Sequence, residues 1–275
     1  MYMYPIGDDV ESNLPRFTYE DLVEVTDGFK DELGKGVFGI VYKGVVGENT
    51  VAVKKLNMLL HDGEKEFKAE VDTIARTHHK NLVQLLGYCN DGDQRLLVYE
   101  HMSNGTLAEF LFGDMRPTWT QRSYIVVEIA KGLAYLHEEC STQIIHCNIK
   151  PQNILLDDYF NATISDFVLA KRLMMNQKII SCRKSLAFET DNEGVVVLTD
   201  LAWDCYQEGQ LHAFVNSDLE ALDDYNKLTT FMMVGLWCIQ ENSSKRPTMR
   251  KVIQMLEGGI EVGEPPCPFS ISVTS

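Results

Sequence analysis

The fold of this chain is decided by the stretch IHCNIKPQN at residues 145–153, together with the dipeptide DF at residues 166–167. The stretch has the layout H-x-D-x-K-x-x-N with asparagine in the third place, and the dipeptide follows it at the distance of a β-hairpin. Short motifs of this kind also occur by chance in unrelated proteins. The interpretation therefore depends on which elements lie upstream.

A glycine-rich segment lies upstream, where GKGVFGIV at residues 34–41 has the pattern G-x-G-x-x-G-x-V. A dinucleotide-binding version of this pattern follows a strand and opens a helix. Here the glycines instead lead into a strand-like run that begins at Ile40. The pattern predicts a hairpin, in which glycine lets backbone N–H groups approach a phosphate without an intervening Cβ. A simple tight turn is the alternative for this element taken alone.

A lysine and a glutamate follow the glycines at informative positions. Lys54 ends the apolar run VAVK at residues 51–54. A lysine in such a place commonly extends to solvent, but behind a glycine-rich loop it can instead reach the phosphates of a nucleotide. Glu70 can hold that lysine as an ion pair, because it lies on a helix predicted from the spacing of Phe67, Val71 and Ile74.

The order of predicted elements indicates an α+β protein. Strand-like runs with a single helix among them extend to about residue 99. The apolar period then changes to that of a helix over residues 120–138, a β-and-loop region covers 143–170, and 195–258 is mostly helical. The seam near residues 100–105 is where we expect a cleft.

Four ordered matches over about 130 residues identify a family. The chain resembles plant receptor-like serine/threonine protein kinases, and most closely the G-type lectin S-receptor-like group. The segments FTY at 17–19, HKNLVQLLGYC at 79–89 and RPTMR at 246–250 resemble that group as well. The resemblance covers residues 15–170 and 181–268, with a break between them.

This resemblance implies a two-lobed protein-kinase fold of the α+β class. We expect a juxtamembrane-like leader over 1–27 that packs only partly, and a β-rich N-terminal lobe with one helix over 28–101. A truncated, helical C-terminal lobe over 102–262 and an irregular tail over 263–275 complete the prediction.

The resemblance also implies a site for ATP and Mg²⁺. Lys54 and Glu70 would form the conserved type of ion pair between strand and helix, and Tyr99 would be the gatekeeper beside adenine. Asn153 and Asp166 would hold magnesium, and position 148 together with Lys150 would be catalytic. The other positions expected to bind the nucleotide are Gly34, Gly36, Gly39, Val41, Ala52, Glu100, Met102 and Leu155.

Two substitutions depart from the family pattern. Asn148 stands where the family has the aspartate that accepts the proton of the substrate hydroxyl, and an amide can orient a hydroxyl but not deprotonate it. The loss of a positioned base typically costs about 10²–10⁴ in rate. Val168 stands in place of the glycine of DFG, and its β-branch is expected to disfavour a positive φ. Cys147, in place of arginine, resembles a common variant within the group.

The largest departure is a missing segment. The activation loop, the APE motif and the long buried helix of the family do not appear, and only 77 residues separate Val168 from Arg246. Arg246 would lose its partner glutamate and become exposed or pair with Glu241 or Asp204. Residues 171–194 join ends that are not neighbours in the family, so we expect them to form a mobile loop.

Composition limits the partners. A net charge of −15, from 40 acidic against 25 basic side chains, disfavours nucleic acid and anionic lipid. Seven irregularly spaced cysteines without a CxxC pair predict neither a disulfide framework nor a zinc site. No apolar run reaches 18 residues, so we expect no membrane insertion and a cytosolic location, on the cytosolic side of the plasma membrane if the chain is part of a longer receptor. Expected partners are ATP and other receptor-like kinases or signalling proteins.

Three interpretations of function remain open at this point. The chain is a pseudokinase that binds ATP, an active serine/threonine kinase that phosphorylates proteins, or a non-functional or decoy product of a decayed receptor kinase gene. Asn148, Val168 and the missing segment disfavour the second. The intact nucleotide-binding positions favour the first, which is the interpretation we carry forward.

Overall fold

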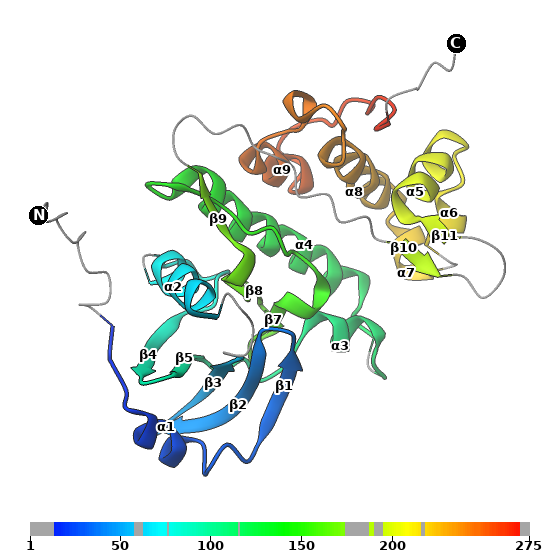
Figure 1. Ribbon diagram of the computed structural model, residues 1–275. Coiled ribbons are helices and arrows are strands. Elements are labelled where there is room, and N and C mark those ends of the chain that lie inside the picture. The colour runs from blue at the N-terminus through cyan, green and yellow to red at the C-terminus, as the bar shows by residue number, and fades with distance from the viewer. Residues whose placement is uncertain are drawn as a thin grey trace, which may run out of the picture. The chain divides into compact units, whose positions relative to one another are not determined.

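A computed structural model describes residues 14–57, 63–75, 77–114, 116–173, 187–189, 195–215 and 218–269, with backbone alone for 63, 65, 66, 172–173, 187–189 and 195–197. The chain divides into two compact units (Figure 1). The first comprises residues 1–116 with 135–174, and the second comprises 117–134 with 175–275.

An antiparallel sheet of five strands dominates the first unit, in the order β1-β2-β3-β5-β4 (Figure 1). Gly47, with φ of 62°, allows the tight turn between β2 and β3, where Val46 pairs with Asn49. The predicted hairpin after the glycines is therefore present. The strands are β1 Glu32–Gly36, β2 Gly39–Val46, β3 Asn49–Leu56, β4 Leu85–Asp91 and β5 Gln94–Glu100.

One face of this sheet is covered by α1, Tyr19–Val25. The helix begins with a capping box in which Thr18 and Asp21 satisfy each other's backbone N–H groups. Leu22 is fully buried and packs in a cluster with residues of β3, β4 and β5. The one helix predicted for this part of the chain is α2, Gly63–Ile74, in which Phe67, Val71 and Ile74 are buried as their spacing predicted.

The predicted leader is packed more closely than expected from residue 14 onward. The backbone of Phe17 donates to Tyr88 O, and Tyr88 donates to Pro15 O. Phe17 lies so close to Gly87 that a Cβ there would be 2.5 Å from its ring. Position 87 must therefore be glycine, because the leader approaches β4 closely there. The polar composition of the leader did not predict this approach. Residues 1–13 lie outside the described part.

Short elements complete the first unit. The β-and-loop region predicted at 143–170 contains two small ladders, β6 with β9 and β7 with β8. These elements are α3 Leu107–Phe112, the π-helix η2 Tyr135–Glu139, β6 Gln143–Ile145, the 3₁₀-helix η3 Pro151–Asn153, β7 Ile154–Leu156, β8 Ala162–Ile164, the 3₁₀-helix η4 Phe167–Leu169 and β9 Lys171–Leu173.

The second unit is mostly helical, as the sequence predicted. Its helices pack in two apolar clusters, one around α5 and α8 and the other around α4, α8 and α9. The elements are α4 Trp119–Ala134, β10 Ala187–Glu189, β11 Val195–Val197, α5 Leu198–Gln207, α6 Leu211–Phe214, α7 Leu219–Asp223, α8 Tyr225–Cys238, the 3₁₀-helix η5 Ser243–Lys245 and α9 Met249–Leu256.

The junction expected to be a loop contains strands at both of its described ends. Residues 171–173 form β9, which pairs with β6, and 187–189 form β10, which pairs with β11. The prediction of a loop throughout 171–194 is therefore wrong for these residues, because backbone pairing does not need the apolar periodicity that the segment lacks. Residues 174–186 and 190–194 lie outside the described part.

Arg246 and the tail show how the end of the second unit is held. Arg246 is half-buried, and its Nε donates to the carbonyl oxygen of Gln240 at 2.7 Å. This contact is with a backbone carbonyl, and the pairing of Arg246 with Glu241 or Asp204 stays a prediction. The irregular tail is anchored, since the buried Gln240 side chain donates to Pro266 O at 2.8 Å.

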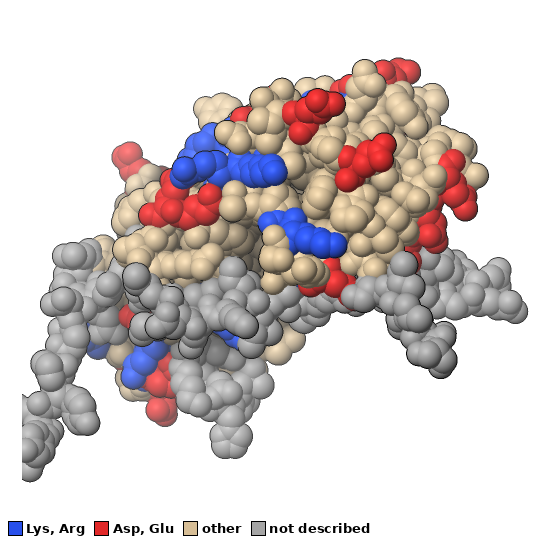
Figure 2. All heavy atoms as spheres, turned by 90° about the horizontal axis from the view of Figure 1, so that it is seen from above, with Lys and Arg blue, Asp and Glu red and all other residues tan. Residues whose placement is uncertain are grey.

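Acidic side chains are dispersed on the face drawn in Figure 2, with basic ones between them rather than in one continuous strip. No helix in the described ranges is both long and apolar enough to cross a membrane.

Candidate nucleotide site

The register of the sheet brings four of the predicted residues to one face. Val41 of β2 pairs with Lys54 of β3, and Ala52 of β3 pairs with Tyr99 of β5. Directly paired residues in an antiparallel sheet project to the same side. Since Ala52 and Lys54 are two positions apart, all four side chains lie on the face opposite to α1.

Lys54 lies at the centre of a buried ionic cluster. Its Nζ is 3.0 Å from Glu70 Oε2 and 3.0 Å from Asp166 Oδ1. Burial by itself lowers the pKa of Lys54, but the carboxylates of Glu70 and Asp166 outweigh it, so the pKa is raised. The lysine is therefore charged at neutral pH, held from both sides and aimed at the place where phosphates are expected.

Tyr99 reinforces the ion pair. Its hydroxyl donates to Glu70 Oε1 at 2.7 Å, so the glutamate is fixed by both the lysine and the tyrosine. Burial and the neighbouring Glu70 raise the pKa of the phenol well above its usual value, which keeps it a donor. This hydrogen bond could not be predicted from the sequence, which placed Tyr99 only beside the adenine.

Asp166 is held by three side chains. Its Oδ1 accepts from Lys54, and its Oδ2 accepts from the amide Nδ2 of Asn148 at 3.2 Å and of Asn153 at 3.3 Å. Its backbone has φ of 64°, a left-handed conformation that aspartate tolerates better than most residues. The positive φ thus falls at Asp166. Val168 lies buried in η4 without a positive φ, as expected for a β-branched residue.

His146 and Ser165 connect the two motifs and were not among the predicted site residues. His146 Nδ1 accepts from the backbone N–H of Asn148, so Nε2 carries the proton and donates to Ser165 O at 2.9 Å. Burial lowers the pKa of His146 and favours this neutral form. The Ser165 hydroxyl in turn donates to Asn153 O at 3.0 Å. The sequence could have indicated His146, because it is the histidine of the H-x-D pattern.

The residues expected to bind adenine also lie in the first unit. Glu100 ends β5, and its backbone N–H is occupied by Gln84 O at 3.1 Å. Met102 follows two residues later, half-buried, and among the described residues its N–H donates no hydrogen bond. Leu155 lies half-exposed between two buried neighbours on β7, so it faces away from their core. This leaves a backbone donor and an apolar side chain available for a planar base.

The glycines at residues 34 and 36 give the test of whether a nucleotide fits. A Cβ at either position would meet no atom within 4 Å, so the protein's own packing does not demand glycine there. Gly39 differs, because a Cβ there would be 2.2 Å from Lys55 O. The room beside the first two glycines, together with the charged lysine, suits a phosphate chain.

Magnesium is accommodated by a smaller set of ligands. No cluster of three or more His, Cys, Asp or Glu side chains that would hold a metal occurs in the described ranges. Mg²⁺ is commonly bound by one or two protein groups together with substrate phosphates, and Asp166 with the amide oxygen of Asn153 would suffice for that. These residues therefore fit a cation that arrives with the nucleotide.

Lys150 is placed apart from this network. It precedes η3, its side chain is exposed, and its backbone carbonyl accepts from Asn153 N at 2.9 Å. The predicted catalytic role of Lys150 stays a prediction.

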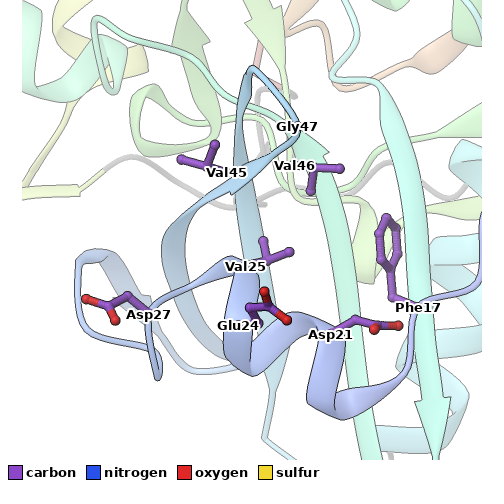
Figure 3. Close-up of a pocket in the computed structure, with 8 residues that line it drawn as sticks. All are labelled: Phe17, Asp21, Glu24, Val25, Asp27, Val45, Val46 and Gly47. Atoms are coloured by element: carbon purple, nitrogen blue, oxygen red, sulfur yellow. The ribbon is translucent and has the colours of Figure 1, made fainter.

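A separate hollow of about 660 Å³ lies beside α1, and Lys54 is not among its lining residues (Figure 3). Phe17, Val25 and Val46 line it together with the carboxylates of Asp21 and Asp27, with Glu24, Val45 and Gly47 completing the lining. Asp21 is engaged in the capping box, and Asp27 pairs with Lys30 at 3.2 Å. Two of its three carboxylates thus already serve the local fold, and we assign it no ligand.

With this geometry established, the comparisons with known proteins define the class. The model of the family described as protein tyrosine and serine/threonine kinase matches residues 28–190. The chain belongs to this protein kinase family, and the predicted α+β kinase fold is confirmed.

The particular relatives are plant receptor-like kinases, as the motifs indicated. The chain is 46% identical to G-type lectin S-receptor-like serine/threonine-protein kinase RLK1 of Arabidopsis thaliana, over 95% of this chain and 36% of that protein. It is 44% identical to G-type lectin S-receptor-like serine/threonine-protein kinase LECRK2 of Oryza sativa subsp. japonica, over 94% of this chain and 37% of that protein. The chain spans about a third of the length of these relatives.

The alignment with the Arabidopsis relative also bears on the missing segment. It extends over 305 positions, whereas 95% of 275 residues is about 261, so about 44 positions have no counterpart in this chain. This number is a total over the whole alignment, and the missing activation segment stays a prediction from the motifs.

Proposed function

We propose that this chain binds ATP in the first unit and transfers the γ-phosphate slowly or not at all, acting as a pseudokinase or signalling scaffold. The observation that carries the proposal is the contrast at one site. Lys54 lies 3.0 Å from both Glu70 and Asp166, as a nucleotide-binding lysine requires. The residue at the base position, Asn148, is instead an amide that donates to Asp166.

The binding chemistry follows from the chain's own groups. The Lys54 ammonium would pair with phosphates, the free N–H of Met102 would donate to the adenine edge, and Val41, Ala52 and Leu155 would contact its faces. Mg²⁺, bound with the nucleotide, would neutralise charge on the phosphate chain. Phosphoryl transfer depends mainly on positioning and electrostatics, so the loss of a base at position 148 slows it rather than forbids it.

The names of the relatives suggest the cellular setting. We propose that the chain acts on the cytosolic side of the plasma membrane as part of a receptor-like protein, with other receptor-like kinases or signalling proteins as partners. Residual transfer, where it occurs, would go to serine or threonine.

A thermal-shift series tests nucleotide binding. Mg-ATP at 100 times its dissociation constant should stabilise the fold by about 2.7 kcal/mol. Lys54→Met should abolish most of this shift, because methionine cannot pair with phosphate. Lys55→Met is the matched control, since Lys55 Nζ lies on the other face of β3, 3.1 Å from the Tyr19 hydroxyl. A cooperative melt that does not shift at millimolar Mg-ATP would refute the proposal.

A further inference from the structure

The contact between Asn148 and Asp166 bears on whether the site needs a divalent cation. A carboxylate has only acceptors, so the group that faces Asp166 Oδ2 at 3.2 Å must be the NH₂ of the Asn148 amide. The Asn148 side chain is buried, with 8% exposure, and a second amide, from Asn153, approaches the same oxygen at 3.3 Å. Both oxygens of Asp166 therefore have donors in the protein itself.

The charged side chains of this site leave one negative charge uncompensated. Glu70 and Asp166 contribute two negative charges, and Lys54, in contact with both, contributes one positive charge. An aspartate at position 148 would add a third negative charge at hydrogen-bond distance from Asp166. Two carboxylates that share a site repel each other strongly unless a cation or a proton lies between them.

We propose that the Asn148 amide takes the place of a divalent cation at Asp166, so that the nucleotide site is assembled without metal and binds ATP with little dependence on Mg²⁺. Asn148 is thus a positioning residue that acts through Asp166. The amide neutralises no charge, but it stands in place of a carboxylate that would need neutralising. This inference rests on the proposed ATP binding.

Melting experiments with and without Mg²⁺, in the absence of nucleotide, test the claim that the site is assembled without metal. The melting temperature of the unaltered chain should be the same, within about 1 °C, in EDTA and in millimolar Mg²⁺. Asn148→Asp should melt about 4 °C or more below the unaltered chain in EDTA and recover most of the loss in Mg²⁺. Asn242→Asp is the matched control, since it adds the same charge at an exposed position where the side-chain oxygen already accepts from Ser244 N. It should melt alike in both buffers.

Calorimetric titration with ATP in the same two buffers tests the claim that ATP binding depends little on Mg²⁺. For the unaltered chain, the ratio of the dissociation constant in EDTA to that in Mg²⁺ should stay below about 3. For Asn148→Asp the ratio should exceed about 10, because the repulsion between the two carboxylates is relieved only when Mg²⁺ is present. Asn148→Ala removes the amide without adding charge and should raise the ratio by less, which keeps the test available if the aspartate variant does not fold.

The outcomes separate the two claims. No ATP binding in either buffer refutes the proposed function together with the ATP half of this inference, while the melts without nucleotide still decide the role of Asn148. Binding of ATP by the unaltered chain that requires Mg²⁺ as strongly as binding by Asn148→Asp overturns the inference and leaves the proposed function standing. Equal melting of Asn148→Asp and the unaltered chain in EDTA also overturns it.

Discussion

At the scale of single residues, the site is determined by contacts that link positions far apart in sequence. Glu70 and Asp166 meet at Lys54, although Asp166 is 112 residues away from it. The resemblance predicted the pairing of Lys54 with Glu70, but it placed Asp166 at the magnesium and not beside Lys54. Motif spacing did not predict that Tyr99 binds Glu70 or that Asn148 binds Asp166, since these contacts depend on burial and side-chain orientation.

His146 gives a prediction about pH. Burial lowers its pKa in the folded protein, so the unfolded chain takes up a proton first as the pH falls below about 6.5. The unfolded state then binds more protons, and the free energy of unfolding decreases from pH 7 toward pH 5, by at most about 1.4 kcal/mol per pH unit for each such histidine.

Replacement of this histidine should flatten the dependence. In denaturant titrations at several pH values, His146→Gln should show a smaller loss of stability between pH 7 and 5 than the unaltered chain. If the free energy of unfolding changes with pH equally in the variant and the unaltered chain, His146 is not the group that takes up the proton. His79, His101 and His137 also have pKa values lowered by burial, so part of the slope should remain.

Tyr99 gives a prediction about stability. Its buried hydroxyl donates to a charged carboxylate, and such hydrogen bonds typically contribute about 1.5–3 kcal/mol. Tyr99→Phe should lower the free energy of unfolding by about that amount in urea titrations. Tyr159→Phe, at a side chain that is 84% exposed, should change it by less than about 0.5 kcal/mol. Equal effects of the two substitutions would rule out the proposed contribution of the Glu70 contact.

At the scale of elements, the helix that covers the sheet was the least predictable. The polar residues of α1 suggested a leader, yet its one fully buried residue, Leu22, packs against three strands. Apolar periodicity cannot be read from so short a helix, and the close approach of Phe17 to Gly87 depends on the position of β4. The strands and α2 were predictable because their apolar residues alternate or recur regularly.

Truncation of Leu22 measures how much this helix contributes. Leu22→Ala should lower the free energy of unfolding by about 2–5 kcal/mol, because it leaves a cavity in a well-packed cluster. Leu219→Ala, at a leucine that is 73% exposed in α7, should have little effect. Chemical denaturation followed by circular dichroism distinguishes the two. A loss below about 0.5 kcal/mol for Leu22→Ala would mean that α1 detaches readily.

At the scale of the whole molecule, the activation segment that the motifs indicate to be missing gives a prediction about catalysis. We expect no autophosphorylation by the chain above that of Lys54→Met in assays with labelled ATP. Asn148→Asp alone should not restore turnover, because the platform for a peptide substrate is absent from the sequence. Robust transfer to a peptide by the unaltered chain would contradict the pseudokinase assignment.

The family and the α+β fold were predictable from sequence. The contacts made by the residues around the missing segment were not. Four ordered motifs sufficed to recognise a kinase, since each has a fixed place in the fold. Nothing in the sequence indicated that β9 would pair with β6, or that Arg246 would donate to the carbonyl of Gln240. These contacts join short elements and single groups, which leave no periodic signal in the sequence.

The packing of α1 has a practical consequence for the production of this protein. The region that matches the kinase family begins at residue 28, which makes that position a natural start for a recombinant fragment. A fragment that starts there would lack Phe17 and Leu22. The apolar residues of the sheet against which they pack would then be exposed. Exposed apolar patches of this kind promote self-association. Fragments meant for crystallisation or binding assays should therefore begin before Pro15, whose carbonyl still bonds to β4.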